Sequence, residues 1–374
     1  MVEIGALPDG EVGMTSYRWL AGALAACAVM LNGAVANAQD IKLKYSAYLP
    51  ESFTAVQIDK WFMEEVTKRT NGRVTFETYF GGSLLSAVET VPGLTAGVAD
   101  FGSLVPIYNP ELLPLAGIIQ PFLSDKVDAV ARAYLDLSHV NAAFGDEWKR
   151  NKLKMLYPMV TTEDTMWSHK QVSSADDLKG MRIRAATGNA EALGILGATP
   201  VAMPFADGVE AYKNGAIDGF STFSFDVAEN VGLIEMSEYV SNAGRMGTLA
   251  PAVTAFNLDS WERLPKDVQD VILEVADLSI QRYLGVIDKT VDATVDALLK
   301  NGKIVVTRIS DEEAARWKDA AAQAVWDKWI ARVEGMGVAD ARGTFNQFRE
   351  LIAKYEPTST YVTGLDRYWA RKPQ

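Results

Sequence analysis

Residues 265–302 read PKDVQDVILEVADLSIQRYLGVIDKTVDATVDALLKNG, and this stretch decides the architecture of the chain. Pro265 suits the first turn of a helix, and Asn301 with Gly302 suits its end. Between them apolar residues recur at helical spacing, with no proline and with one glycine, Gly285. At a rise of 1.5 Å per residue such a helix extends about 50 Å, which exceeds one domain. We predict one helix that runs along two domains, and two helices kinked near Gly285 are the alternative.

Strand-like and helix-like segments alternate on both sides of this helix. Period-two hydrophobicity predicts strands at 41–48, 74–80, 100–102, 153–160, 165–168, 181–185, 199–203, 216–220 and 304–307. Apolar residues on one helical face predict helices at 55–70, 86–96, 189–196, 207–214, 317–335 and 340–356. This alternation is typical of an α/β fold with mainly parallel sheets flanked by helices.

The alternation starts again near residue 153, which predicts two similar α/β domains with a ligand in the crevice beyond the strand ends. We expect domain one to comprise 39–161 and about 249–285. Domain two would then comprise 162–248 and about 286–340, and 341–374 would form a C-terminal helical segment.

The N-terminus has the pattern of an export signal. Arg18 precedes an apolar run, which is too short to span a bilayer, and a small-x-small cleavage site follows at 36–38. We therefore predict a cleaved signal peptide over 1–38, with the true start at Met14, and a periplasmic protein. A lipoprotein anchored through Cys27 is the alternative.

The composition excludes several function classes. Lys and Arg total 36 against 48 Asp and Glu, so the formal charge is −12 and nucleic-acid binding is disfavoured. Two His and one Cys leave little material for zinc sites or nucleophilic catalysis. The sequence has no calcium-loop or phosphate-loop motif. We therefore expect no enzyme, no cofactor and no metal.

One arginine is placed differently from the others. Residues 178–184, LKGMRIR, predict a strand entered from a glycine turn, with Arg182 and Arg184 on one side and Ile183 on the other. If Arg184 ends the strand, its planar guanidinium can reach the crevice and hold a carboxylate by two parallel hydrogen bonds. A salt bridge at the surface or between the domains is the alternative.

Four motifs occur in an order that resembles the DctP-type solute-binding proteins of TRAP (tripartite ATP-independent periplasmic) transporters. They are FMEEVTKRTNGR (62–73), DLKGMRIR (177–184), LGATPVAMPF (196–205) and GAIDG (215–219), and the resemblance covers nearly all of 40–350. It implies a two-domain periplasmic binding protein fold, with one long helix spanning both domains. It also implies that the domains close on a small organic carboxylate and deliver it to membrane permease subunits.

Three other functions are weighed against this one. A binding protein of an ABC transporter shares the compartment and the crevice. A periplasmic enzyme acting on a carboxylate belongs to a different class, and the shortage of His and Cys opposes it. A sensory protein that presents its ligand to a receptor is the third.

The resemblance also implies the site residues. Arg184 matches the family's carboxylate-binding arginine, and Phe205 matches an aromatic side chain that lines the ligand. Thr222 and Phe223 fall where an asparagine often faces the ligand. Tyr48 lies in the loop after the first strand, which usually forms a pocket wall.

Trp167 and Asp164 lie on the crossing strand, where many members of the family place a second arginine. This chain has no arginine between Arg150 and Arg182, which argues against a sialic-acid or typical dicarboxylate ligand. One arginine with aromatic rings suits a monocarboxylate with an apolar or aromatic body. If Asp164 faces the pocket, a zwitterion with a cationic tail is the alternative. For three further aromatic residues core packing is the favoured interpretation: Phe53, Tyr108 and Phe225.

Overall fold

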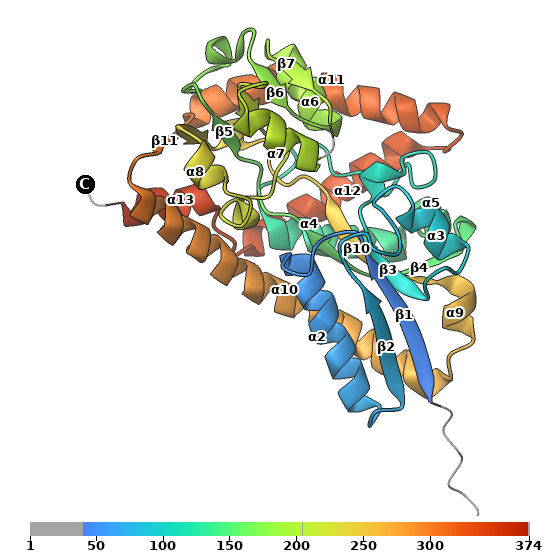
Figure 1. Cartoon of the computed structure of the whole chain (residues 1–374). Coiled ribbons are helices and arrows are strands. Elements are labelled where there is room, and N and C mark those ends of the chain that lie inside the picture. Colours follow the sequence, from blue (N-terminus) through green and yellow to red (C-terminus); the bar gives the residue numbers. More distant parts are fainter. Residues whose placement is uncertain (1–39, 204, 373–374) are drawn as a thin grey trace, which may run out of the picture. The chain divides into compact units, whose positions relative to one another are not determined.

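The computed structural model describes residues 40–203 and 205–372, and their strands form two sheets (Figure 1). The first sheet has the order β2 (Val74–Tyr79), β1 (Ile41–Ala47), β3 (Phe101–Leu104), β10 (Pro251–Asn257), β4 (Leu153–Val160). The second has the order β11 (Val305–Thr307), β9 (Tyr239–Ser241), β5 (Met166–Ser168), β8 (Gly219–Phe220), β6 (Arg182–Arg184), β7 (Thr199–Val201). We call the elements around the first sheet lobe one and those around the second sheet lobe two.

Each sheet contains a strand that runs against its neighbours. β10 is antiparallel to β3 and β4, whereas β1 and β3 are parallel. In the second sheet β5 is antiparallel to β8 and β9, whereas β6 is parallel to β7 and β8. The α/β class is confirmed. The sequence analysis missed β10 because all seven of its residues are buried, so that it shows no polar alternation.

Helices flank both sheets. The α-helices are α2 (Thr54–Arg69), α3 (Thr90–Thr95), α4 (Val127–Val140), α5 (Ala142–Arg150), α6 (Thr187–Ile195), α7 (Phe205–Lys213), α8 (Leu233–Met236), α9 (Leu258–Glu262), α10 (Lys266–Asn301), α11 (Asp311–Gly335), α12 (Ala341–Tyr355) and α13 (Gly364–Arg371). Short 3-10 turns are η1 (Pro106–Tyr108), η2 (Ala175–Leu178), η3 (Phe225–Val227), η4 (Ala243–Arg245) and η5 (Glu356–Thr358). Besides β10, the sequence analysis missed β9 and the helices α4, α5, α8 and α9, and it described α13 only as part of a C-terminal helical segment.

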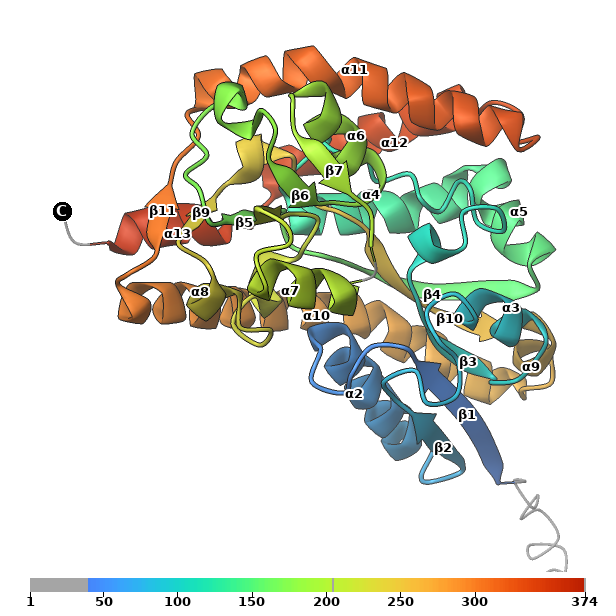
Figure 2. The same cartoon turned by 45° about the horizontal axis from the view of Figure 1, so that its top comes forward.

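The predicted long helix is a single helix, α10, of 36 residues. Gly285 does not interrupt it, and Gly302 ends it with a left-handed backbone, at a φ of 62°. α10 packs on α2 and β4 of lobe one and on η3 and α8 of lobe two, and Figure 2 shows it running past both sheets. Its buried face is thus shared by the two lobes.

Two further segments connect the lobes, 161–165 between β4 and β5 and 242–250 between β9 and β10. They run side by side, because the Thr161 amide donates to the Ala250 carbonyl at 3.1 Å and the Asp164 amide donates to the Gly247 carbonyl at 2.8 Å. The domain boundaries predicted near 161 and 249 fall in these crossing segments and stay a prediction.

The predicted signal peptide, the start at Met14 and the alternative lipid anchor at Cys27 lie outside the described residues. None of the helices that the structure does describe is long and apolar enough to cross a membrane.

Candidate functional site

Arg184 is the last residue of β6, and only 6% of it is exposed. The strand holds it between β7 and β8, where it pairs with Val201 and Phe220. Its Nη1 donates to the carbonyl oxygens of Ser221 at 3.3 Å and Thr222 at 2.9 Å. The arginine therefore lies in the interior, so the alternative of a surface salt bridge is wrong.

The guanidinium of Arg184 keeps an unpaired donor. Its Nε is buried and has no hydrogen-bond partner among the described residues. The partners found for its other nitrogens are neutral carbonyl oxygens, Met203 at 3.4 Å being the third. Burial lowers the pKa of Arg184, whereas Tyr108 and Asp164 act to raise it. The guanidinium is thus a buried cation that donates to neutral carbonyl oxygens and forms no direct ion pair among the described residues, and burying such a charge is costly.

The backbone beside Arg184 is strained at two threonines. Thr187 and Thr222 have φ values of 51° and 58°, which β-branched residues rarely adopt. The Thr222 hydroxyl accepts a hydrogen bond of 3.1 Å from the amide of Ala186, the residue before Thr187. This contact joins the two strained backbone segments. Strain of about 1–3 kcal/mol per residue is typical of functional sites. Neither position is a glycine or an asparagine, so the sequence does not indicate a left-handed backbone there.

Three phenylalanine rings pack beside the arginine. Phe205 and Phe223 stack with centroids 5.0 Å apart, and both meet the edge or face of Phe220 at 5.9 Å. The Arg184 guanidinium lies over the Phe220 ring at 5.1 Å. The structure therefore brings Phe205, Phe223 and Thr222 together with Arg184, and it adds Phe220, which the sequence analysis did not single out.

Two tyrosines contribute from lobe one. Tyr48 follows β1 and Tyr108 ends η1, which follows the neighbouring parallel strand β3. Their half-buried rings meet edge to face at 5.5 Å. Burial raises the pKa of Tyr48, and its interaction with Tyr108 raises it further. Tyr108, which was assigned to core packing, is half-buried and acts electrostatically to raise the pKa of Arg184.

Asp164 is linked to the arginine through Ser221 and is 1% exposed. Its Oδ2 accepts from the Asn189 amide at 2.8 Å and from the Ser221 hydroxyl at 2.6 Å, and its Oδ1 accepts from the Phe223 amide at 3.3 Å. Burial raises the pKa of Asp164 to about 6, and these hydrogen bonds oppose the rise. Since both oxygens are engaged by protein donors, the geometry does not favour binding of a ligand's cationic tail by Asp164.

Trp167 takes a different place from the other candidates. It is fully buried in β5, and its ring stacks on Phe225 with centroids 6.5 Å apart. Its Nε1 donates to the Thr165 hydroxyl at 3.0 Å. The indole is thus part of the core of lobe two. Its predicted role as a pocket wall is not tested, and full burial does not favour that role.

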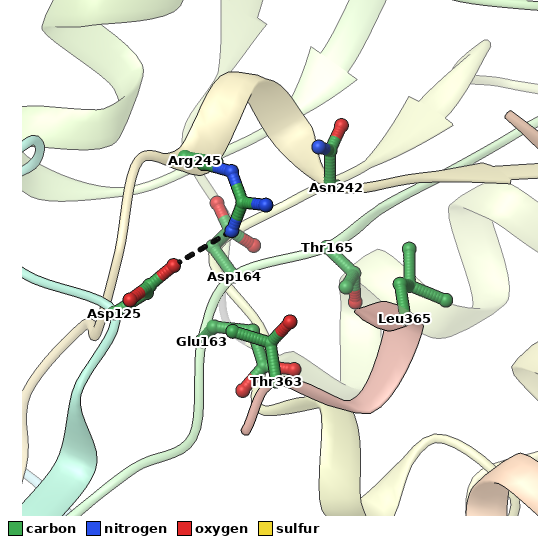
Figure 3. A pocket seen from close by; sticks show the side chains of 8 residues that line it. All are labelled: Asp125, Glu163, Asp164, Thr165, Asn242, Arg245, Thr363 and Leu365. Carbon is green, nitrogen blue, oxygen red and sulfur yellow. Dashed lines mark hydrogen bonds and ion pairs between the residues drawn. The ribbon is translucent and has the colours of Figure 1, made fainter. Parts of the chain in front are cut away.

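A second arginine, Arg245, lies in a small pocket beside the crossing segments (Figure 3). The pocket is lined by Asp125, Glu163, Asp164, Thr165, Asn242, Arg245, Thr363 and Leu365. Arg245 pairs with Asp125 at 3.0 Å, Asp311 at 3.1 Å and Asp366 at 3.2 Å. With three acids around it, this guanidinium is already neutralised, in contrast to Arg184.

The chain has two α/β lobes that share a long helix, and a buried arginine lies at the end of a strand. This combination is the architecture of a solute-binding protein. The family model of the bacterial extracellular solute-binding proteins, family 7 (DctP), matches residues 45–332. The chain belongs to this family and is a solute-binding protein of the TRAP type, which confirms the resemblance.

Known proteins agree with this assignment. A solute-binding protein of Albidiferax ferrireducens is 25% identical over 333 residues, covering 84% of this chain and 94% of that one. A TRAP solute-binding protein of Rhodoferax ferrireducens, crystallised with copurified benzoate, is 27% identical with a TM-score of 0.75, covering 86% and 100%. A TRAP periplasmic solute-binding protein of Desulfovibrio salexigens in an open form is 27% identical with a TM-score of 0.75, covering 86% and 99%.

Proposed function

We propose that this protein captures a small organic carboxylate in the periplasm, between its two lobes, and delivers it to TRAP permease subunits. The observation that carries the proposal is the buried guanidinium of Arg184, whose Nε has no hydrogen-bond partner among the described residues. A carboxylate can accept from a guanidinium through two parallel hydrogen bonds, which fixes its orientation as well as its position.

We propose a monocarboxylate with an apolar or aromatic body as the ligand. The Phe220 ring lies against the guanidinium, and the rings of Phe205 and Phe223 pack on Phe220, so apolar rings cluster beside the charge. The benzoate that copurified with the Rhodoferax ferrireducens relative has this chemistry, which supports the proposal.

The ligand would act by favouring the closed arrangement of the lobes. Arg184 belongs to lobe two, whereas Tyr48 and Tyr108 belong to lobe one. A ligand that contacts both groups binds the closed form more tightly, so its binding shifts the population toward closure. The crossing segments and α10 would bend while each sheet moves as a unit. In this proposal the chain binds its solute without catalysis and is exported through the signal peptide.

Isothermal titration calorimetry with benzoate and a panel of organic acids tests the proposal. Arg184→Ala should weaken binding by about 10- to 100-fold, the size of a charge-assisted hydrogen bond. Arg182→Ala is the matched control, because Arg182 lies two residues away on the same strand, is exposed and pairs with Asp218 at 3.2 Å. Full affinity in Arg184→Ala, or an equal loss in both variants, contradicts the proposal.

A further inference from the structure

Asp164 and Arg184 are connected through one residue, Ser221. The carbonyl oxygen of Ser221 accepts from Arg184 Nη1 at 3.3 Å, and the hydroxyl of the same serine donates to Asp164 Oδ2 at 2.6 Å. Asp164 also influences Arg184 electrostatically. The two charges therefore sit in one buried unit at the end of β6, although they do not form a direct ion pair.

The surroundings of Asp164 suit an ionised carboxylate. The groups that contact it are an amide NH₂ of Asn189, the Ser221 hydroxyl and a backbone N–H of Phe223, and all three donate. An ionised carboxylate only accepts hydrogen bonds, so this arrangement satisfies it without a proton of its own. Arg184 and Asp164 then contribute one positive and one negative charge, and the unit is electrically balanced before a ligand binds.

Lobe one adds neutral groups at this point. The lobe-one side chain that acts electrostatically on Arg184 is Tyr108, whose ring meets that of Tyr48, and a phenol can donate a hydrogen bond without adding positive charge. The paired arginine nearby, Arg245, is surrounded by three acids. These groups thus offer a second anionic group hydrogen bonds and no unpaired positive charge.

We propose that Asp164 is a specificity-determining residue, which restricts the site to singly charged carboxylates by repelling a second negative charge. The first carboxylate gains more from Arg184, whose guanidinium keeps an unpaired donor, than it loses to the more distant Asp164. A second carboxylate adds repulsion by Asp164 in a buried, weakly screened setting, and Arg245 is already paired with three acids. This inference rests on the proposed function and adds to it the residue that sets the charge of the ligand.

The test compares ligands of nearly equal shape that differ by one charge. The probes are 4-carbamoylbenzoate against terephthalate and succinamate against succinate, titrated into the mature protein by calorimetry at pH 7.5. Wild-type protein should bind the monoanion of a pair about tenfold or more tightly than the dianion, the effect of about one charged contact. Asp164→Asn should reduce this ratio to about threefold or less by improving dianion binding relative to the monoanion.

Asp59→Asn is the matched control. Asp59 is also a fully buried aspartate with three hydrogen bonds, from Tyr45, Tyr157 and Thr254, but it lies in lobe one between α2 and the first sheet. Its variant should lose stability while keeping the wild-type ratio. If Asp164→Asn does not fold, Asp164→Ser removes the same charge and keeps a hydroxyl acceptor.

The outcomes separate the two proposals. Binding of both probes of a pair with equal affinity by wild-type protein, or an unchanged ratio in the folded Asp164 variant, overturns the role of Asp164 and leaves the solute-binding proposal standing. Failure of every carboxylate in the panel to bind overturns both. A merely structural role of Asp164 would weaken both members of a pair equally, so a constant ratio also counts against the inference.

Discussion

The Tyr361 hydroxyl donates a hydrogen bond of 2.5 Å to Oε2 of Glu163, and this contact joins the C-terminal segment to the crossing segment between the lobes. The amide of Gly364 donates to the other oxygen of Glu163 at 2.6 Å. The same C-terminal segment reaches lobe one, because Lys126 Nζ donates to the Tyr361 carbonyl at 3.0 Å. The C-terminal segment thus forms hydrogen bonds with the crossing segment 161–165, which would bend when the lobes close.

Tyr361→Phe should destabilise the protein by about 1–3 kcal/mol, because it leaves a buried carboxylate oxygen without its donor. Urea unfolding followed by circular dichroism measures this change. Tyr355→Phe is the control, since Tyr355 bonds to Asp136 at the partly exposed surface of the same C-terminal region, and its loss should cost about 0.5 kcal/mol or less. Equal decreases in the free energy of unfolding of the two variants would show that the hydrogen bond from Tyr361 to Glu163 stabilises the protein no more than the surface contact of Tyr355.

Glu163 should also make the stability depend on pH. Burial raises its pKa from 4.5 to about 7, and the hydrogen bonds from Tyr361 and Gly364 only partly oppose this. The folded protein therefore holds the proton more tightly than the unfolded chain does. The stabilising contribution of this group is complete below pH 4.5 and is lost as the pH rises to about 7.

Glu163→Gln removes the titrating group, so its free energy of unfolding should fall less than that of wild-type protein between pH 4.5 and 7. Urea unfolding at intervals of half a pH unit gives the two curves. Other buried carboxyls, such as Glu147 with a pKa of about 7, contribute to both curves and cancel in their difference. Parallel curves would refute the assignment of this titration to Glu163.

The α/β architecture could be read from the sequence where the pattern was local. The helix at 266–301 carries its own start, its own end and an uninterrupted apolar face. Arg184 could be placed at a strand end because the preceding glycine turn and the alternation around Ile183 fix the phase of β6. Both features depend on neighbouring residues alone.

Other features depend on residues far apart in the chain and left no local signal. Tyr361 and Glu163 are separated by 198 positions, and Tyr108 acts electrostatically on Arg184 from the other lobe. Trp167 is an aromatic residue on a crossing strand, which fits a pocket wall and a core position equally well from sequence. The structure buries it against Phe225, and only the packing distinguishes the two environments.

Gly208 in α7 should be needed for the geometry of the site. A Cβ at this position would come within 3.0 Å of both Arg184 Cγ and Phe220 Cε2, so Gly208→Ala must displace the arginine or the ring. We expect its affinity for benzoate to fall about tenfold, because the displaced guanidinium meets the carboxylate less well, while the overpacking itself should cost about 1–3 kcal/mol of folding stability. Calorimetry gives the affinity and thermal melting confirms the fold.

Gly194→Ala in α6 is the control for Gly208→Ala. Its Cβ would meet the Pro200 ring at an ordinary 3.5 Å, while the gain in helix propensity is the same in both variants. Unchanged affinity is therefore expected for Gly194→Ala. A loss of affinity in Gly194→Ala equal to that in Gly208→Ala would mean that helix stiffening, and not contact with Arg184, is responsible.

Tyr108→Phe should reveal the contribution of lobe one to binding. The variant keeps the ring that packs on Tyr48 and removes the hydroxyl that acts electrostatically on Arg184, so the fold should persist while a hydrogen-bond donor is lost. The expected loss of benzoate affinity is about three- to tenfold, which corresponds to one neutral hydrogen bond. Tyr79→Phe controls for loss of a phenol in the same lobe, since Tyr79 bonds to Glu77 on β2. If Tyr108→Phe binds benzoate as wild-type protein does, the ligand contacts lobe one through other side chains, and closure must be explained without this tyrosine.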